Sequence, residues 1–280
     1  MSERASVPKE AQDDAAEEAA EQSGTATGAE SVVTALENAG VEYLFGVQGG
    51  AIMPVYDALY EHEEMTHVTM AHEQGAAHAA DAYGIVSGEP GVCMATSGPG
   101  ATNLVTGLAD ADMDSDPVVA LTGQVPTDLV GNDAFQETDT IGVTQPVTKY
   151  NVFSDSADTV GDDVGTAWAL ANAGRQGPTL VDLPKDVTQG ETEESPGSPR
   201  TPDTYSPPEE AEAPVVAAAA EALAAAEQPV ILAGGGVIKG EAWDELRGFA
   251  LEYEVPVVTT MPGIGAFPED HDLSLGMAGM

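Results

Sequence analysis

Basic residues are scarce in this chain of 280 residues, which has Lys+Arg 8 against Asp+Glu 48 and a formal net charge of −40 at pH 7. Nucleic acids and anionic membranes bind to local positive charge, so this composition argues against both as partners. A dense carboxylate surface is typical of adaptation to high salt, which screens the repulsion between like charges. The sequence therefore predicts a halophilic protein that is less stable at low salt.

Cysteine and long apolar runs are also nearly missing. The one cysteine, Cys93, excludes an intrachain disulfide, and its apolar surroundings favour a buried side chain over a reactive thiol. No stretch approaches the ~20 apolar residues of a membrane-spanning helix. The N-terminus has acidic residues where a signal peptide needs an apolar core. We therefore expect a cytoplasmic protein that does not enter membranes.

Composition and periodicity divide the chain into four parts. Residues 1–28 have almost no apolar residue except alanine and are predicted to be a disordered acidic tail. Six strands alternate with helices over 29–190. Residues 191–213, rich in Pro, Ser, Thr and Glu, are predicted to form a linker, and 214–280 hold two further strands with two helices. The predicted fold class is α/β: a doubly wound, mostly parallel sheet followed by a partial Rossmann-like domain.

Two predicted strands end in segments suited to ligand binding. An apolar run over 68–71 leads to Glu73 at the start of an Ala- and Gly-rich helix, and a strand over 92–96 ends in Ser97-Gly98-Pro99-Gly100. Parallel strands place such ends on one edge of the sheet, where these folds bind ligands. The spacing alone leaves open that Glu73 is only a carboxylate at a helix N-terminus and that the glycine loop is only a tight turn.

Four segments carry a family resemblance: AHEQGAAHAADAYG, ATSGPGATN, MDSDPVVALTGQV and DAFQETD. They resemble the amino-terminal domain of thiamine-diphosphate-dependent enzymes, and most closely the catalytic large subunits of acetolactate synthases. The similarity covers about residues 29–280. HEQGAAHAADAYG and SGPGATN belong to the wider family, whereas GQVPTDLVGNDAFQETD and GPTLVDLPKDV narrow the resemblance to acetolactate synthases.

The resemblance implies a transferase of branched-chain amino-acid biosynthesis that decarboxylates pyruvate and joins the remainder to a second 2-oxoacid. The implied cofactors are thiamine diphosphate, Mg²⁺ and FAD. The implied assembly is a homodimer or homotetramer, with which a small regulatory subunit is compatible. Two alternatives stay open: another thiamine-diphosphate-dependent carboligase or decarboxylase, and a truncated, non-catalytic fragment that acts only in subunit association.

The same resemblance assigns site residues. Glu73 would hydrogen-bond N1′ of the aminopyrimidine and so activate the cofactor. Phe135 and Gln136 would line the channel above the thiazolium, and Lys185 would attract a 2-oxoacid carboxylate. Further residues expected at the thiamine are Gly49, Gly50, Ser97, Gly98, Pro99, Gly100 and Gln124. Residues that match those near FAD in the family are Arg175, Gly234, Gly235 and Gly236.

No metal ligands are predicted within the chain. Ala76 stands where an HExxH zinc motif that starts at His72 would need histidine. The other histidines show no spacing typical of metal ligands. In the family, Mg²⁺ is held by a carboxyl-terminal domain marked by Gly-Asp-Gly, which does not occur in these 280 residues. The 280 residues alone are therefore predicted to be inactive.

Overall fold

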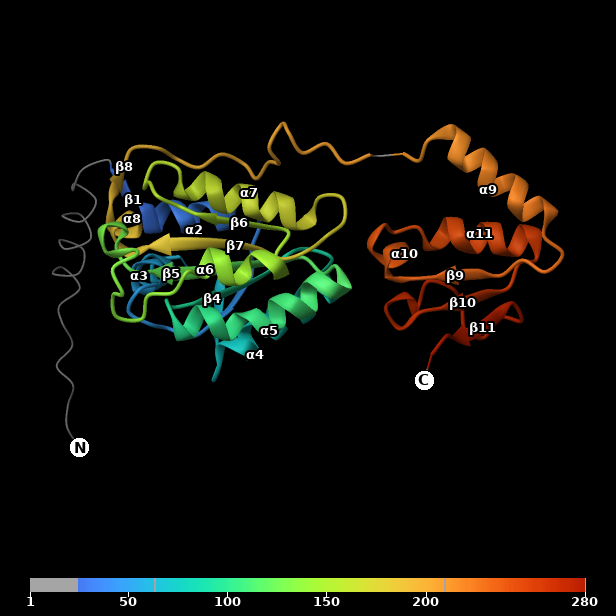
Figure 1. Ribbon diagram of the computed structural model, residues 1–280, viewed down its shortest axis with the longest axis horizontal. Helices are drawn as coiled ribbons and strands as arrows, with labels where there is room; N and C mark the ends of the chain where they lie inside the picture. Colours follow the sequence, from blue (N-terminus) through green and yellow to red (C-terminus); the bar gives the residue numbers. More distant parts are fainter. Residues whose placement is uncertain (1–24, 63, 209, 280) are drawn as a thin grey trace, which may run out of the picture.

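A computed structural model describes residues 25–62, 64–208 and 210–279, so most of the predicted acidic tail lies outside the described residues. The first domain is built on a six-stranded sheet with the order β3-β2-β4-β5-β7-β6, in which every neighbouring pair is parallel (Figure 1). Its strands are β2 (Tyr43–Gly46), β3 (Thr66–Thr69), β4 (Gly91–Ala95), β5 (Val118–Gln124), β6 (Tyr150–Phe153) and β7 (Thr179–Pro184). The predicted doubly wound α/β fold is confirmed.

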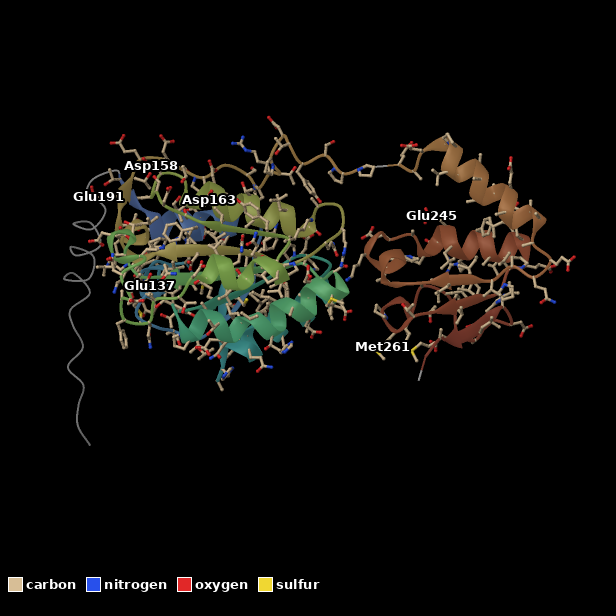
Figure 2. All side chains as sticks on the ribbon, viewed as in Figure 1. Glu137, Asp158, Asp163, Glu191, Glu245 and Met261 are labelled. Atoms are coloured by element: carbon tan, nitrogen blue, oxygen red, sulfur yellow. The ribbon has the colours of Figure 1, made fainter. Side chains whose placement is uncertain are left out.

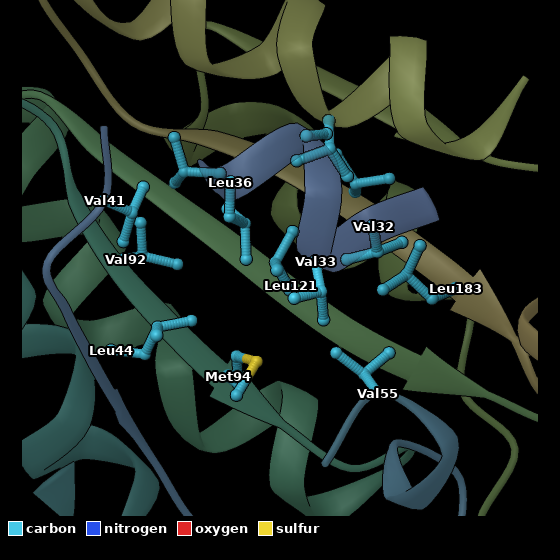
Figure 3. Close-up of a cluster of buried hydrophobic side chains, with 14 of the residues drawn as sticks. Val32, Val33, Leu36, Val41, Leu44, Val55, Val92, Met94, Leu121 and Leu183 are labelled. Carbon is cyan, nitrogen blue, oxygen red and sulfur yellow. The ribbon is translucent and has the colours of Figure 1, made fainter. Parts of the chain in front are cut away.

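Helices cover both faces of this sheet. One face packs against α2 (Gly28–Asn38), α3 (Met53–Tyr60), α7 (Val160–Asn172) and α8 (Lys185–Gln189), and the other against α4 (Glu73–Ser87), α5 (Pro99–Asp114) and α6 (Thr140–Thr144). Because side chains alternate along a strand, Val92 and Met94 of β4 join the first core, seen in Figure 3, whereas Cys93 and Ala95 join the second. Both layers of helices therefore bury apolar side chains against the same strands.

Ordered structure begins earlier than the composition predicts, because β1 (Ala26–Thr27) pairs antiparallel with β8 (Glu191–Thr192). Thr27 also forms a capping box with Glu30: the Glu30 N–H donates to Thr27 Oγ1 at 3.2 Å and the Thr27 N–H donates to Glu30 Oε2 at 2.5 Å. The last residues of the predicted tail therefore start the first helix, and the first residues of the predicted linker form a strand.

The second domain has a three-stranded parallel sheet, β11-β10-β9. Its elements are α9 (Ala213–Ala225), β9 (Ile231–Ala233), α10 (Gly235–Lys239), α11 (Trp243–Tyr253), β10 (Val257–Thr259), the 3-10 turn η3 (Met261–Gly263) and β11 (Ser274–Met277). Two other 3-10 turns, η1 (Thr127–Leu129) and η2 (Gln145–Val147), belong to the first domain. None of the 13 residues of α9 is buried. The sequence predicts α9, β9, α11 and β10 but misses α10 and β11.

Two further sequence predictions concern burial. Cys93 is a fully buried free thiol, and burial raises its pKa to about 12, which confirms the predicted core role. Within the described ranges, none of the helices has the length and apolar character needed to cross a bilayer.

Candidate active site at the carboxyl edge of the first sheet

Six connections leave the carboxyl edge of the first sheet, at the end of the domain that lies away from the second domain (Figure 1). Parallel topology alone therefore brings distant segments to one edge, and the site draws on the connections after β2, β3, β4, β5 and β7. Most of the residues predicted to bind thiamine lie in these connections.

Glu73 is the first residue of α4, where His72 caps the helix by accepting the Gln74 N–H at 3.1 Å. The half-buried Glu73 carboxylate accepts a hydrogen bond from Asn103 of α5, with 3.0 Å between Nδ2 and Oε2. Within the described chain its other oxygen, Oε1, accepts no hydrogen bond. The carboxylate is thus oriented by one partner and keeps one oxygen for a ligand.

Glycines form a close-packed cradle beside this carboxylate. A Cβ on Gly100 would lie 2.8 Å from Thr96 Cγ2 and 3.5 Å from Glu73 Oε1, and a Cβ on Gly49 would lie 2.4 Å from Thr96 Cβ. Thr96 Oγ1 also accepts the Ala51 N–H at 3.2 Å, which joins the connection after β2 to that after β4. A Cβ on Gly50 meets nothing within 4 Å. The cradle is therefore filled by Thr96 at Gly49 and Gly100 and is open at Gly50.

The long connection over 125–139 lies against this cradle. Gly98 has a φ of +59°, and a Cβ there would lie 2.5 Å from the Gln136 carbonyl oxygen. Glu137, labelled in Figure 2, accepts N–H bonds from Gly131 and from Ala134, and these bonds lower its pKa. The loop thereby holds itself together and brings the Gln136 backbone onto Gly98, while Phe135 stays 87 % exposed.

Gln124, at the end of β5, lies inside the protein, because it is only 2 % exposed. Its Nε2 donates to Asp182 Oδ2 and to the Thr138 carbonyl, both at 2.9 Å. Burial raises the pKa of Asp182 to about 6, although hydrogen bonds from Thr122 and Gln124 oppose the rise. The amide of Gln124 is thus occupied by protein partners, which differs from the cofactor contact that the sequence predicts.

Lys185 is the first residue of α8, directly after β7. Its side chain is part-exposed, and within the part of the chain that the structure describes its Nζ forms no ion pair or hydrogen bond. An unpaired cation therefore stands at the same sheet edge as Glu73.

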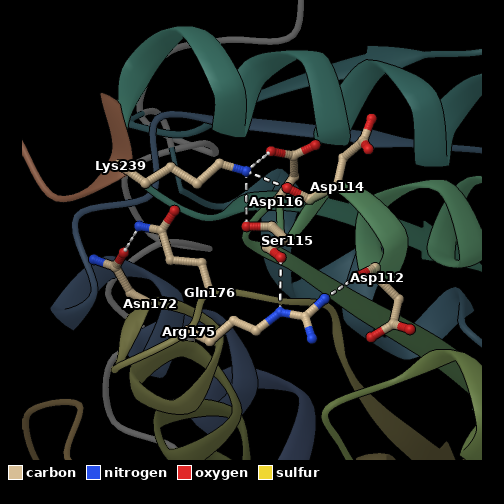
Figure 4. Close-up of polar contacts among 8 residues, drawn as sticks. All are labelled: Asp112, Asp114, Ser115, Asp116, Asn172, Arg175, Gln176 and Lys239. Atoms are coloured by element: carbon tan, nitrogen blue, oxygen red, sulfur yellow. Dashed lines mark hydrogen bonds and ion pairs between the residues drawn. The ribbon is translucent and has the colours of Figure 1, made fainter. Parts of the chain in front are cut away.

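The predicted flavin residues gather elsewhere, beyond the other end of α5. Arg175 donates from Nε to Ser115 Oγ at 2.8 Å and from a terminal nitrogen to the Asp112 carbonyl at 3.1 Å (Figure 4). Arg175, Gly235 and Gly236 line a cavity of about 490 Å³ between the domains, and Gly234 directly precedes this pair. Since α5 has 16 residues, its two ends are about 24 Å apart.

Lys239 of the second domain lines the same cavity and fixes it to α5. Its Nζ donates to the carbonyls of Asp114 at 2.5 Å and Ser115 at 2.9 Å, and it forms an ion pair with the buried Asp116 (Figure 4). Burial, followed by the neighbouring Asp116, raises the pKa of Asp81 to about 7. Cations and acids therefore meet at this end of the helix.

Two aspartates lie near a histidine at spacings that the sequence does not mark as a metal site. His78, Asp81 and Asp110 each place a ligand-type atom within 4.8 Å of the others. His78 Nδ1 lies 3.5 Å from Asp110 Oδ2, so a pairing of these two side chains accounts for part of the cluster. This cluster is separate from the glycine cradle.

Three contributors to the site are absent from the sequence predictions. Asn103 follows Pro99 by four residues on α5, so helical spacing within SGPGATN could have placed it beside Glu73. Thr96 and Asp182 carry no such signal, because their roles arise from contacts between strands and loops that are far apart in the sequence.

Two family models match the chain: the thiamine pyrophosphate enzyme N-terminal TPP-binding domain over residues 26–143 and the thiamine pyrophosphate enzyme central domain over residues 216–280. The chain belongs to the thiamine-diphosphate-dependent enzyme family. The first match contains Glu73, the glycine cradle and the whole 125–139 loop, and the second contains the glycines at the cavity.

Among curated members of this family, the chain is 49% identical over 255 residues to an acetolactate synthase of Mycobacterium bovis. It is 50% identical over 256 residues to a probable acetolactate synthase large subunit of Methanocaldococcus jannaschii and 47% identical over 261 residues to the acetolactate synthase large subunit of Corynebacterium glutamicum. These matches cover 90–91% of this chain but only 41–43% of the relatives, so the chain spans about two fifths of their length.

Proposed function

We propose that this chain supplies the pyrimidine-activating half of an acetolactate synthase, an enzyme that decarboxylates pyruvate and joins the remaining two carbons to a second 2-oxoacid. Bound thiamine diphosphate would supply the carbon nucleophile for this chemistry. The observation that carries the proposal is the Glu73 carboxylate, oriented by Asn103 beside a glycine cradle with Oε1 left without a partner. A carboxylate held in this way suits exchange of a proton with a ring nitrogen.

Each group at the edge has a defined part in the proposal. Glu73 holds and moves the proton at N1′ of the pyrimidine, Asn103 keeps the carboxylate in place, and the backbone at Gly50 and Gly98 borders the ring. Gly49 and Gly100 are required by packing against Thr96, whereas a Cβ on Gly50 would meet nothing within 4 Å, so the open side of the cradle for a flat heterocycle is at Gly50. Mg²⁺ and the diphosphate would be held by residues outside this set.

Lys185 is the proposed group for the substrate carboxylate. Two other cations stabilise helix C-termini in place of ligands: Lys149 Nζ donates to the Leu170 carbonyl at the end of α7, and Lys239 binds the last carbonyls of α5. Lys185 has no such partner and stands at the edge that carries Glu73. In a chain of net charge −40, an unpaired cation there would attract 2-oxoacids locally.

The interdomain cavity is the proposed flavin site. Its volume of about 490 Å³ falls in the range of cofactor pockets, and Arg175 offers a fixed cation. A Cβ on Gly236 would meet nothing within 4 Å, so protein packing does not require glycine there. A ligand that approaches the backbone closely would account for it.

A Glu73→Gln substitution tests the thiamine assignment. Glutamine keeps the shape but cannot exchange the proton, so in the full-length enzyme turnover of pyruvate should fall by about 10²–10⁴-fold with the fold unchanged. Asp110→Asn, which alters an exposed carboxylate of α5, is the matched control and should leave turnover unchanged. Turnover close to wild type in Glu73→Gln would refute the assignment.

We also propose that the acidic composition is an adaptation to salt. Thermal stability should then rise from low to molar KCl, because screening weakens repulsion among the carboxylates. Thermal unfolding followed by circular dichroism across this range measures the effect. A flat or falling melting temperature would show that the charge is not coupled to the folded state. Because relatives are named large subunits, we also propose that the protein assembles into a homodimer or homotetramer that can bind a small regulatory subunit.

A further inference from the structure

A buried hydrogen-bond network lies directly beneath the 125–139 loop. Asp182 is 1 % exposed and stands opposite Thr122 in the β5–β7 pair. Its Oδ1 accepts the Thr122 hydroxyl at 2.7 Å and its Oδ2 accepts Gln124 Nε2 at 2.9 Å. Both carboxylate oxygens are thus bound by residues of the neighbouring strand, which fixes the carboxylate rigidly.

Gln124 transmits this fixed geometry to the loop. Besides Asp182, its Nε2 donates to the Thr138 carbonyl at 2.9 Å, and its Oε1 accepts the Val125 N–H at 2.9 Å. The amide cannot rotate by 180° without placing its nitrogen against Val125 N–H and its oxygen against two acceptors. Asp182 therefore determines which end of the Gln124 amide faces Thr138.

The loop that Thr138 belongs to reaches the glycine cradle. Gln136 has a φ of +58°, and its carbonyl packs where a side chain on Gly98 would otherwise be. Thr138 lies two residues further on, between Gln136 and the α6 cap Asp139, whose Oδ1 accepts the Gly142 N–H at 2.9 Å. A shift at Thr138 would therefore move the Gln136 backbone relative to Gly98.

We propose that Asp182 is a positioning residue: through Gln124 it holds the 125–139 loop, and with it Gln136, against the Ser97–Gly100 turn. This rests on the proposed function only in that the cradle is where the thiamine would bind. Burial of the network also raises the pKa of Asp182, and among the described residues Asp139 is the charged group that adds to this rise. The ionised Asp182 carboxylate makes a stronger hydrogen bond to Gln124 than a neutral group would, so the burial of this charge helps to keep the loop in place.

Amide hydrogen exchange on the 280-residue chain tests the proposal, without thiamine diphosphate. Asp182→Asn removes the negative charge: the amide oxygen can still accept from Gln124 Nε2 while the NH2 faces the Thr122 hydroxyl, so the bond that holds Gln124 against Thr138 weakens from a charged to a neutral one. Amides protected inside the loop, including those of Ala134, Glu137 and Thr140, should exchange about tenfold faster. Asp163→Asn is the matched control, because Asp163 is a half-buried carboxylate that likewise accepts a hydroxyl, from Ser154 at 2.8 Å, but lies away from this loop.

A double variant, Asp182→Asn with Gln124→Glu, separates positioning from simple stability. The new amide can donate to the new carboxylate, which still accepts the Val125 N–H, so the melting temperature should recover toward wild type. A carboxylate cannot donate to the Thr138 carbonyl, so loop exchange should remain fast. If Asp182→Asn does not fold, the double variant alone decides the question.

Two results would overturn the proposal: loop exchange in Asp182→Asn no faster than in Asp163→Asn, or slow loop exchange in the folded double variant. Either result concerns the loop alone and leaves the assignment of Glu73 intact. Conversely, wild-type turnover in Glu73→Gln would remove the thiamine assignment without changing the exchange result, so the two failures are distinguishable.

Discussion

The two ends of α5 differ in how they use charge. At its N-terminal end, Glu73 is held by the neutral amide of Asn103, and the glycine cradle supplies backbone in place of side chains. At its C-terminal end, Arg175 and Lys239 bind the last residues of the helix and the buried Asp116. Cations in this acidic chain are thus committed to structure where the domains meet, whereas the candidate active site is left with few charged partners.

The few cations of this chain are not spread evenly over the first domain. A cation near a helix C-terminus is favoured by the helix dipole and by unsatisfied carbonyls. Lys and Arg therefore stabilise a helix most when they lie at its C-terminal end. The N-terminal end of α5 already offers N–H groups and partial positive charge without any side chain. The candidate site can therefore be electropositive locally even though the chain is strongly acidic.

Removing Lys239 should have the largest effect, because it removes the contacts between the second domain and the C-terminal end of α5. Lys239→Ala leaves Asp116, 3 % exposed, without its cation beside Asp81, and the free energy of unfolding should fall by about 3 kcal/mol. The domains should also separate in small-angle scattering, because the bonds from Nζ to α5 are lost. Arg247→Ala is the control: its pair with Asp244 is exposed, so chemical denaturation should show a loss below about 1 kcal/mol. Equal losses of stability in the two variants would show that the Lys239 contacts stabilise the protein no more than an exposed ion pair does.

Two buried carboxyl groups, one near each end of α5, should make the stability of the protein depend on pH in different ranges. Burial raises the pKa of Asp182 to about 6 and that of Asp81 to about 7, from ordinary values of 3.8. The folded protein then binds these protons more tightly than the unfolded chain, so stability that is present at low pH is lost as pH rises toward each raised pKa. Relative to wild type, Asp182→Asn should gain roughly 3 kcal/mol between pH 4 and pH 6 and then level off.

Asp81→Asn should instead continue to gain stability relative to wild type up to about pH 7. Denaturation curves in molar KCl at several pH values measure both differences and suppress the general repulsion among carboxylates. Identical pH profiles for the two variants would show that the two ends do not titrate separately.

Two glycine substitutions give a matched pair with smaller effects. Gly98→Ala forces a side chain into a positive φ and onto the Gln136 carbonyl, so it should cost about 1–3 kcal/mol. Gly236→Ala meets open space on α10 and should change stability by no more than about 1 kcal/mol. Its expected effect is on flavin binding, measured by flavin fluorescence. A large loss of stability in Gly236→Ala would place that glycine with Gly98 as a packing requirement.

The sequence predicts the strands and helices of the first domain well because short apolar runs alternate regularly with segments of helical periodicity. It predicts Glu73 and the glycine loop through a motif that is local in the chain. It does not predict that Gln124 points inward, since that depends on Asp182, which is 58 residues away and becomes its neighbour only through β5–β7 pairing. β11 is missed because SLGM is short and contains glycine.

The pairing of β1 with β8 has a consequence for how the first domain can be handled. Ala26 and Thr192 are Cα partners, so the chain enters and leaves this domain at the same place. A domain with adjacent ends behaves as a cassette: it can be transplanted into a loop of another protein, or its ends can be joined by a short connector and new ends opened in an exposed turn. The first domain is therefore a natural unit for circular permutation, in which the order of α2 and α8 along the chain is reversed while the six-stranded sheet stays the same.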